Sequence, residues 1–297
     1  MTQDLSRNPR ARWLAPLAGL SFVVIWCTGY TAGKIAVTHS GAFTALSLRF
    51  GAAALVFGLL AALGKAVWPQ RREALHSVVV GLLQLALQFG GVYGGLKLGA
   101  SAGVAALVIG AMPISVSAFS LLLGERIGRR QWLGLAVGFA GVWLVLGGGL
   151  VDARANVYAV LALLVGLLGI SCGTLYQKRF GSDVDLRVGL FIQNLTAAFA
   201  LLPIAIGLEG LHADGTSAFW LSTLWIVLVN SVGGFALLFV LIRNGAATQV
   251  AALFYLVPAV GAIMGHFTLG EVLTPIEIVG FVVAGVGVYL GTRQPSI

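Results

Sequence analysis

Residues 101–146 read SAGVAALVIGAMPISVSAFSLLLGERIGRRQWLGLAVGFAGVWLVL, and residues 247–292 read ATQVAALFYLVPAVGAIMGHFTLGEVLTPIEIVGFVVAGVGVYLGT. An offset of 146 residues places the triplet Leu123-Gly124-Glu125 on Leu269-Gly270-Glu271 and aligns further apolar and glycine positions on both sides of it. An internal repeat of this length indicates two homologous structural units stacked in one chain. The fold is therefore expected to consist of two similar halves.

The composition excludes a water-soluble domain. Hydrophobic residues make up 59% of the chain and charged residues only 9%, whereas soluble domains carry about 25% charged residues. So few charges predict an all-α integral membrane protein, and the net charge of +8 is then a signal of membrane topology and not of nucleic-acid binding. Cys27 and Cys172 both lie in apolar runs and predict no disulfide framework.

The apolar residues occur in continuous runs and do not alternate with polar ones, which favours helices over strands. A spanning helix needs about 20 mostly apolar residues. Five such runs fall in a first half, 1–150, and five in a second half, 151–297. The ten predicted transmembrane helices are 14–34, 42–63, 75–96, 101–123, 131–148, 157–178, 187–207, 219–242, 246–268 and 275–291.

The basic residues are distributed unevenly between the two sides of this predicted bundle. With the N-terminus inside, fourteen of the 18 Lys and Arg residues fall on the inner side, while Lys34, Lys97 and Arg154 fall at outer ends and Arg49 within a helix. The positive-inside rule then predicts cytoplasmic N- and C-termini. Because five helices per half is an odd number, the second half is inverted. Inverted repeats are typical of secondary transporters.

Three features together resemble the drug/metabolite transporter superfamily, in its ten-helix form with two EamA-like repeats. They are the Leu-Gly-Glu triplets that close proline-containing helices, the Leu48-Arg49-Phe50 stretch, and the glycine-rich last helix of each half. The resemblance covers nearly the whole chain and implies one EamA-like repeat in 1–150 and one in 151–297. Members export amino acids, drugs and other metabolites, and the aromatic content of helices 1, 6 and 9 favours the aromatic amino-acid exporters. In the second half, Asn194 lies near the position that corresponds to Arg49. The two halves therefore do not share a role that depends on an arginine at this position.

No acidic residue falls in the middle third of a predicted helix. Proton-coupled transporters commonly use a buried carboxylate, and such a group is costly enough to stand out in a sequence. This pattern favours facilitated diffusion, with proton-coupled drug efflux as the alternative. Glu125 and Glu271 are interpreted as helix-end caps. Arg49 lies about two turns from a helix end and has two possible roles. Its side chain could snorkel toward the membrane surface or contact a backbone carbonyl, or it could bind a substrate carboxylate.

Uncharged polar and aromatic residues cluster at midplane depth. Amides and hydroxyls can bind both the ammonium and the carboxylate of a zwitterion, weakly enough for release. Any one of them could instead hydrogen-bond between helices. We predict one central cavity between the halves, with substrate-binding residues Trp26, Tyr30, Gln84, Gln88, Tyr176, Gln177, Asn230, Phe254 and Tyr255.

Pro113 and Pro258 lie roughly mid-span in the two copies of the repeat. A proline inside a helix removes a backbone hydrogen bond and clashes with the preceding turn. We predict that both helices bend there and that the bends are hinges, against the alternative of static kinks. Gly134-xxx-Gly138 and Gly287-xxx-Gly291 are instead assigned to close helix packing, within the monomer or between protomers.

A different class of protein is suggested by Gly169-Ile170-Ser171-Cys172-Gly173, which matches the G-x-S-x-G pattern of serine hydrolases. The pattern lies within a predicted helix, and the histidines fall near helix ends or in loops, so an intramembrane hydrolase is only a distant alternative. We predict a multi-pass transporter of the bacterial inner membrane, not an enzyme, which exports a small neutral or zwitterionic metabolite such as an amino acid. It is expected to need no cofactor or metal, to bind no nucleic acid, and to be a monomer or weak homodimer.

Overall fold

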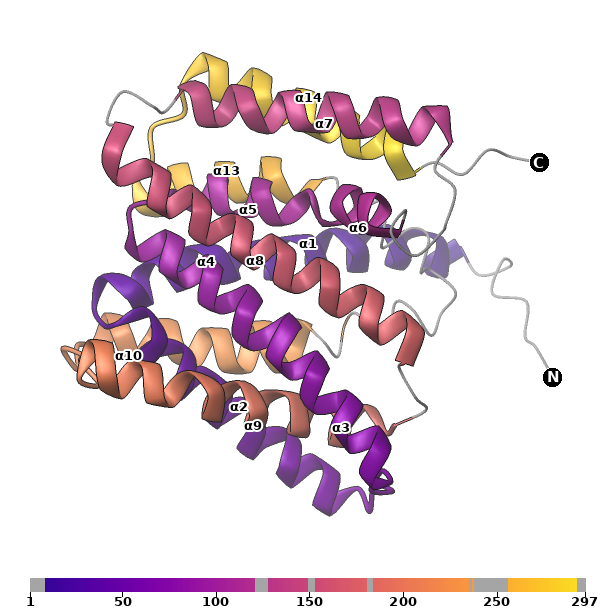
Figure 1. Cartoon of the computed structure of the whole chain (residues 1–297), viewed down its shortest axis with the longest axis vertical. Coiled ribbons are helices and arrows are strands. Elements are labelled where there is room, and N and C mark those ends of the chain that lie inside the picture. Colours follow the sequence, from indigo (N-terminus) through magenta and orange to yellow (C-terminus); the bar gives the residue numbers. More distant parts are fainter. Residues whose placement is uncertain are drawn as a thin grey trace.

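The computed structural model describes residues 9–120, 128–148, 153–180, 184–234, 237 and 256–292. Its regular elements there are helices (Figure 1), with one isolated β-bridge between Ser40 and Ala213. Seven helices are long and apolar enough to cross a membrane, and three shorter apolar helices fall in the predicted fifth, ninth and tenth spans. The helical membrane architecture is thus confirmed. Ten spans and the cytoplasmic orientation of the termini stay predictions.

The elements follow the predicted spans closely, although several spans consist of two or three consecutive pieces. The α-helices are α1 (Pro9–Thr38), α2 (Ala42–Leu63), α3 (Arg71–Val80), α4 (Gln88–Lys97), α5 (Ala102–Gly110), α6 (Met112–Ser120), α7 (Arg129–Gly148), α8 (Ala153–Phe180), α9 (Leu186–Ile204), α10 (Ser217–Trp225), α13 (Val257–Leu269) and α14 (Pro275–Thr292). The π-helical pieces are η2 (Gly81–Leu87), η5 (Ala205–Glu209) and η6 (Ile226–Gly234).

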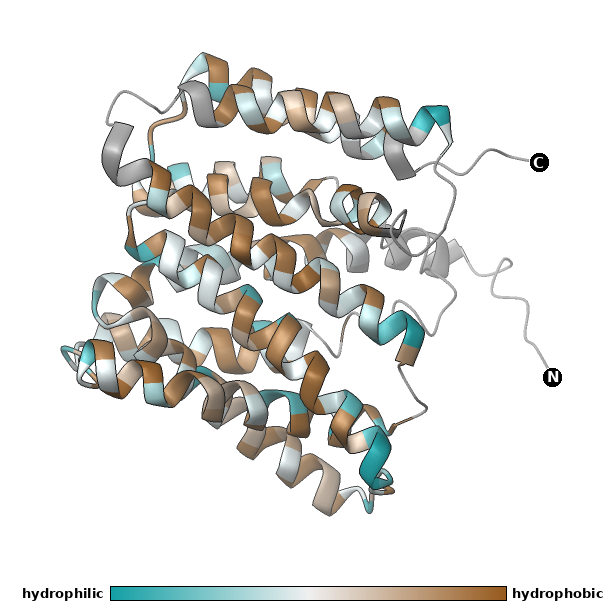
Figure 2. Ribbon diagram, in the orientation of Figure 1, coloured by the Kyte–Doolittle hydropathy of each residue, from teal (hydrophilic) through white to brown (hydrophobic). Residues whose placement is uncertain are grey.

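The outer surface is suited to lipid. Large apolar side chains such as Leu55, Phe267 and Val272 are about four-fifths exposed (76%, 80% and 81%). Figure 2 shows hydrophobic residues along the lengths of the helices and the most hydrophilic residues gathered near helix ends. Because apolar side chains gain nothing from exposure to water, this distribution fits a bundle whose sides face hydrocarbon.

Glycines set the closest helix contacts. A Cβ built on Gly287 would collide with the backbone of Gly138, and one on Gly141 would collide with Ala284. The helices α7 and α14 accordingly lie side by side along the top of Figure 1. The predicted close packing at Gly138 and Gly287 is therefore confirmed as a contact within the monomer.

A second glycine seam explains the G-x-S-x-G pattern of α8. Gly169 faces the backbone of Leu83 and Gln88, so the glycine allows α8 to approach the third span closely. The Ser171 hydroxyl is fully buried, donates to the Leu167 carbonyl at 2.6 Å and contacts the Ser115 hydroxyl. In the described structure this serine thus packs and hydrogen-bonds within the bundle, and its partners include no imidazole.

The two prolines lie near the starts of α6 and α13. The fourth span is interrupted at Ala111, between α5 and α6, immediately before Pro113, and α6 departs from the direction of α5 (Figure 1). Pro258 is the second residue of α13, and residues 251–255 before it lie outside the described residues. A Cβ on Gly110 would lie 3.0 Å from the Pro258 side chain. The break at Pro113 is observed, while a hinge motion at either proline stays a prediction.

Candidate functional site

A cavity of about 520 Å³ lies within the bundle. Its walls come from α1, α2, the third span and α6 in the first half, and from α8, α9 and η6 in the second half. His76 and Tyr93, at opposite ends of the third span, both line it. The cavity therefore follows that span for about 25 Å, at about 1.5 Å per residue. Its volume falls in the usual range of small-molecule sites.

Most of the predicted binding residues surround this cavity. Tyr176 is not among the lining residues, but its hydroxyl contacts Nδ1 of the lining residue His76 at 2.7 Å. Phe254 and Tyr255 lie outside the described residues. The structure brings together Trp26, Tyr30, Gln84, Gln88, Gln177 and Asn230. Their role in substrate binding stays a prediction.

π-helical turns present two of the amides. Gln84 lies in η2 and Asn230 in η6. Such turns are rare and are found mainly at functional sites. The Gln84 side-chain amide donates to the side-chain oxygen Oε1 of Gln177 at 3.1 Å. The Asn230 amide nitrogen donates to the Ile25 carbonyl at 2.5 Å, while its Oδ1 is buried without a hydrogen-bond partner among the described residues. An unpaired buried acceptor at a cavity wall is suited to a ligand donor.

Two glycines of α1 make room for side chains opposite them. A Cβ on Gly29 would lie 3.0 Å from the Asn230 amide nitrogen, and a Cβ on Gly33 would lie 3.1 Å from the Tyr93 ring. These separations are tighter than ordinary carbon contacts. Gly29 and Gly33, together with Trp26 and Tyr30, form one stripe at helical spacing. This stripe of α1 faces the cavity and packs against Asn230 and Tyr93.

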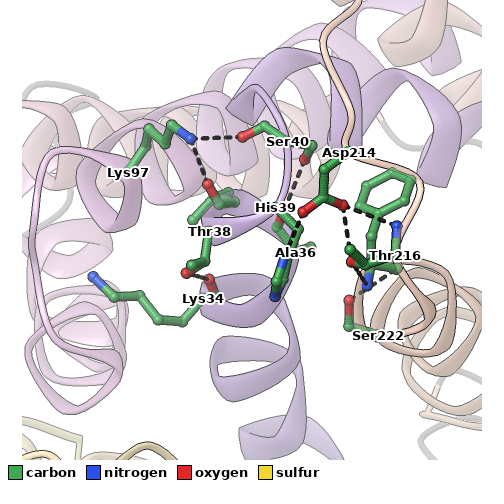
Figure 3. A network of polar contacts seen from close by, with 11 residues as sticks. Lys34, Ala36, Thr38, His39, Ser40, Lys97, Asp214, Thr216 and Ser222 are labelled. Atoms are coloured by element: carbon green, nitrogen blue, oxygen red, sulfur yellow. Dashed lines mark hydrogen bonds and ion pairs between the residues drawn. The ribbon is translucent and has the colours of Figure 1, made fainter.

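One end of the bundle is closed by reciprocal lysine contacts, of which Figure 3 shows those of Lys97. Lys34 of α1 donates to the carbonyls of Leu96 and Ala100, at 2.8 and 2.7 Å, at the end of α4. Lys97 of α4 donates to the carbonyls of Val37 and Ser40, at 2.6 and 2.8 Å, at the end of α1. Cations at helix C-termini satisfy unpaired carbonyls and interact favourably with the helix dipole. Each helix end is therefore capped by a lysine of the other.

The same end joins the two halves of the chain. His39 Nδ1 and Asp214 Oδ2 are 2.7 Å apart, and the Asp214 backbone N–H donates to the His39 carbonyl at 2.9 Å. Asp214 Oδ1 accepts from the Thr216 backbone N–H at 3.0 Å (Figure 3). That backbone N–H, aided by His39, lowers the pKa of Asp214 to about 2. The carboxylate is therefore ionised throughout the physiological range.

Glutamates cap two helix N-termini at this end. Glu209 accepts from the Thr44 backbone N–H at 2.8 Å, at the start of α2. Glu271 accepts from the Ala102 backbone N–H at 2.7 Å, at the start of α5. The interpretation of Glu271 as a helix-end cap is confirmed, although the helix it caps belongs to the other half. Glu125 lies outside the described residues.

The opposite end of the cavity is open. Gln177 and Leu186 line it there and are exposed, while Tyr30, Arg49 and Tyr93 at the other end are no more than 8% exposed. We refer to the end built by Lys34, Lys97, His39 and Asp214 as the network end, and to the end at His76 and Gln177 as the open end. The site is thus a pocket with exposed residues at the open end and buried residues toward the network end.

Comparison with known proteins agrees with this architecture. The sequence profile of the EamA-like transporter family matches residues 13–147 and 157–293. The chain belongs to the EamA-like transporter family. It is 27% identical to the inner membrane transporter YedA of Escherichia coli K12 over 97% of this chain and 96% of the relative. It is 25% identical to a probable amino-acid metabolite efflux pump of Salmonella typhimurium LT2 over 91% and 92%. A solved structure titled "Crystal structure of protein" shares the fold, with a TM-score of 0.66 and 20% identity over 95% of this chain and 98% of that one.

These findings confirm the family expected from the sequence and establish a membrane transporter with two EamA repeats. The relatives are named as transporters and efflux pumps, and several helices of this EamA-like transporter are long and apolar enough to cross a bilayer. The protein is accordingly a multi-pass protein of the inner membrane.

Arg49 and His76 are among the lining residues that were not predicted as parts of the site. Arg49 was left between two interpretations, and the structure places it in the cavity wall. His76 lies near the start of the third span, as expected, and its ring stacks on Phe180 with centroids 5.3 Å apart and lines the open end. Trp26, Gly29 and Tyr30 share one helix face, so their spacing could have predicted Gly29 as a further lining residue.

Proposed function

We propose that this EamA-like transporter exports small neutral or zwitterionic metabolites by alternating access, with amino acids, aromatic ones included, as the first candidates. The observation that supports the proposal is the cavity itself. It is lined by both halves, is open at one end, and is closed at the other by contacts that join the halves. Two repeats around one central site are the general architecture of alternating access.

The predicted topology gives the direction. It places the open end in the cytoplasm and the network end outside, since Lys34 and Lys97 fall at predicted outer ends. In this arrangement the described state is inward-open. A cavity that faces the cytoplasm is suited to load a metabolite for export.

The lining chemistry supports an amino acid. Trp26 and Tyr30 offer aromatic faces for an apolar side chain, and the unpaired Oδ1 of Asn230 is an acceptor for an ammonium group. A relative named as a probable amino-acid metabolite efflux pump points to the same class of substrate. Neutral amide contacts bind weakly, which favours release on the far side.

The lining also supports a facilitative mechanism. Among the described lining residues there is no Asp or Glu that could carry a coupled proton. Proton-coupled drug efflux, the alternative, would require another titrating group. A pH gradient separates the two, because it drives a proton-coupled carrier to accumulate substrate against its concentration gradient, whereas a facilitative carrier does not respond to it.

The test is counterflow of a panel of labelled amino acids in proteoliposomes, with and without a pH gradient. We expect exchange of at least one aromatic amino acid at equal pH, and loss of most of that exchange in Trp26→Ala. Trp220→Ala is the matched control, because Trp220 is 55% exposed on the outer surface away from this cavity. Exchange that occurs only with a pH gradient would contradict the facilitative mechanism, and no exchange of any amino acid would contradict the substrate class.

A further inference from the structure

Arg49 is a cation inside a membrane-spanning helix. It lies on α2 about two turns from the first residue of that helix, and it is 7% exposed. Charged side chains within spans are costly and are retained mainly where they face partners or a functional cavity. Arg49 lines the cavity toward the network end. Among the described lining residues, it is the one that carries a permanent charge.

The guanidinium is only partly satisfied by the protein. One terminal nitrogen donates to the Tyr93 hydroxyl at 3.3 Å, and Nε is buried without a partner among the described residues. The guanidinium carbon lies 4.2 Å from the Phe89 ring centroid and 5.3 Å from that of Phe50. The rings hold the group in place by cation–π contact but accept few of its five N–H donors.

No carboxylate of the described structure neutralises this charge. The six described acidic residues are engaged at helix ends or loops with other partners, and no ion pair to Arg49 is formed. They are Glu73, Asp185, Glu209, Asp214, Glu271 and Glu277. A buried cation without a counter-ion is a strong attractor for an anion, because the surrounding dielectric is low.

We propose that Arg49, oriented by Tyr93 and Phe89, is the anchor for a carboxylate, and that this EamA-like transporter therefore selects carboxylate-bearing metabolites. A guanidinium matches a carboxylate with two parallel hydrogen bonds. This inference rests on the proposed transport function for its biological meaning, and it changes the substrate class: a carboxylate is required, so neutral metabolites without one are excluded and acids without an ammonium group are included.

A purely structural role for Arg49 makes different predictions. In that case Arg49 would only hold the Tyr93 hydroxyl and stack on Phe89. Its replacement would lower stability but would leave the preference among ligands unchanged. Ligand discrimination, and not stability, is therefore the decisive readout.

The experiment measures binding to the purified full chain in lipid nanodiscs by isothermal titration calorimetry. The probes are two isosteric pairs, 3-phenylpropionate with 3-phenylpropionamide and L-phenylalanine with L-phenylalaninamide. In the wild type we expect each carboxylate to bind at least about 10-fold more tightly than its amide, the usual effect of one charge-assisted hydrogen-bonded pair. Arg49→Gln should abolish this preference, and Arg49→Lys, which keeps the charge, should retain part of it.

The matched control is Arg71→Gln, which removes one positive charge from an exposed position at the start of α3. It should leave the preference for carboxylates intact. If neither carboxylate binds the folded wild type, if the amides bind equally well, or if Arg49→Gln keeps the preference, the anchor is wrong. The last two results would leave amino-acid export standing. Carboxylate binding without any counterflow would support the anchor and contradict the transport function.

Discussion

The network end should control which side of the membrane the cavity faces, and Lys34→Met tests this. Lys34 donates two charge-assisted hydrogen bonds to the carbonyls at the end of α4, at 2.7 and 2.8 Å. The side chain is only half-buried, so solvent reduces the value of each bond. A combined loss of about 1–2 kcal/mol is expected when both are removed. If these bonds exist only in the closed arrangement, the ratio of network-open to network-closed molecules should rise about 5- to 30-fold.

The assay follows a single cysteine in the cavity. Gln88→Cys is introduced after Cys27 and Cys172 are replaced with alanine, since Gln88 is 5% exposed and lies in the middle of the lining. A membrane-impermeant maleimide is then added on the network side in oriented vesicles. Labelling from that side requires the minor, network-open state, so its rate reports the population of that state. Lys34→Met should accelerate it about 5- to 30-fold.

Lys65→Met is the control, because Lys65 carries the same charge at an exposed position at the other end of α2. It should leave the rate of labelling unchanged. A monodisperse, folded Lys34→Met protein whose labelling rate equals that of the control would refute the reasoning. The lysine contacts would then be a static brace of the bundle.

Three further outcomes follow from the packing. Gly33→Ala should reduce substrate affinity with little loss of expression, because the added methyl would press on the Tyr93 ring, and binding titration checks this. Pro113→Ala and Pro258→Ala should slow counterflow at near-normal affinity if the breaks are hinges, whereas unchanged rates in both and in the double variant would indicate static kinks. Ser171→Ala should retain counterflow and lose about 1 kcal/mol of stability, because the Ser171 hydroxyl hydrogen-bonds to the Leu167 carbonyl and contacts the Ser115 hydroxyl. Loss of transport without loss of stability would instead indicate a catalytic role for Ser171.

The sequence predicted the architecture because the relevant signals are local. Continuous apolar runs of about 20 residues identify spanning helices without any knowledge of their partners. The repeated Leu-Gly-Glu triplet identified two related units. The small-residue spacing on α7 and α14 predicted close packing, and the Gly138 and Gly287 backbones do meet.

The site could be predicted only in part, because its remaining features depend on which residues, distant in the sequence, lie next to one another in the fold. The role of Arg49 turns on whether a carboxylate lies nearby, and sequence spacing does not reveal that. The partners of Lys34 and Lys97 are backbone carbonyls about 60 residues away along the chain (62 for Leu96 and 60 for Val37). Any residue supplies a carbonyl, so such a contact leaves no side-chain pattern to recognise.

The polar chemistry of the network end explains how a closed end can still open. Lysines cap helix C-termini there and glutamates cap helix N-termini, and these contacts are charge-to-backbone hydrogen bonds. On opening, each charged group can exchange its backbone partner for water, at a net cost of about 0.5–3 kcal/mol per bond. Arg49 is only 7% exposed, and its Nε has no partner among the described residues. A ligand carboxylate at Arg49 would therefore supply a partner that the protein does not, while the hydrated caps at the end form and break around it.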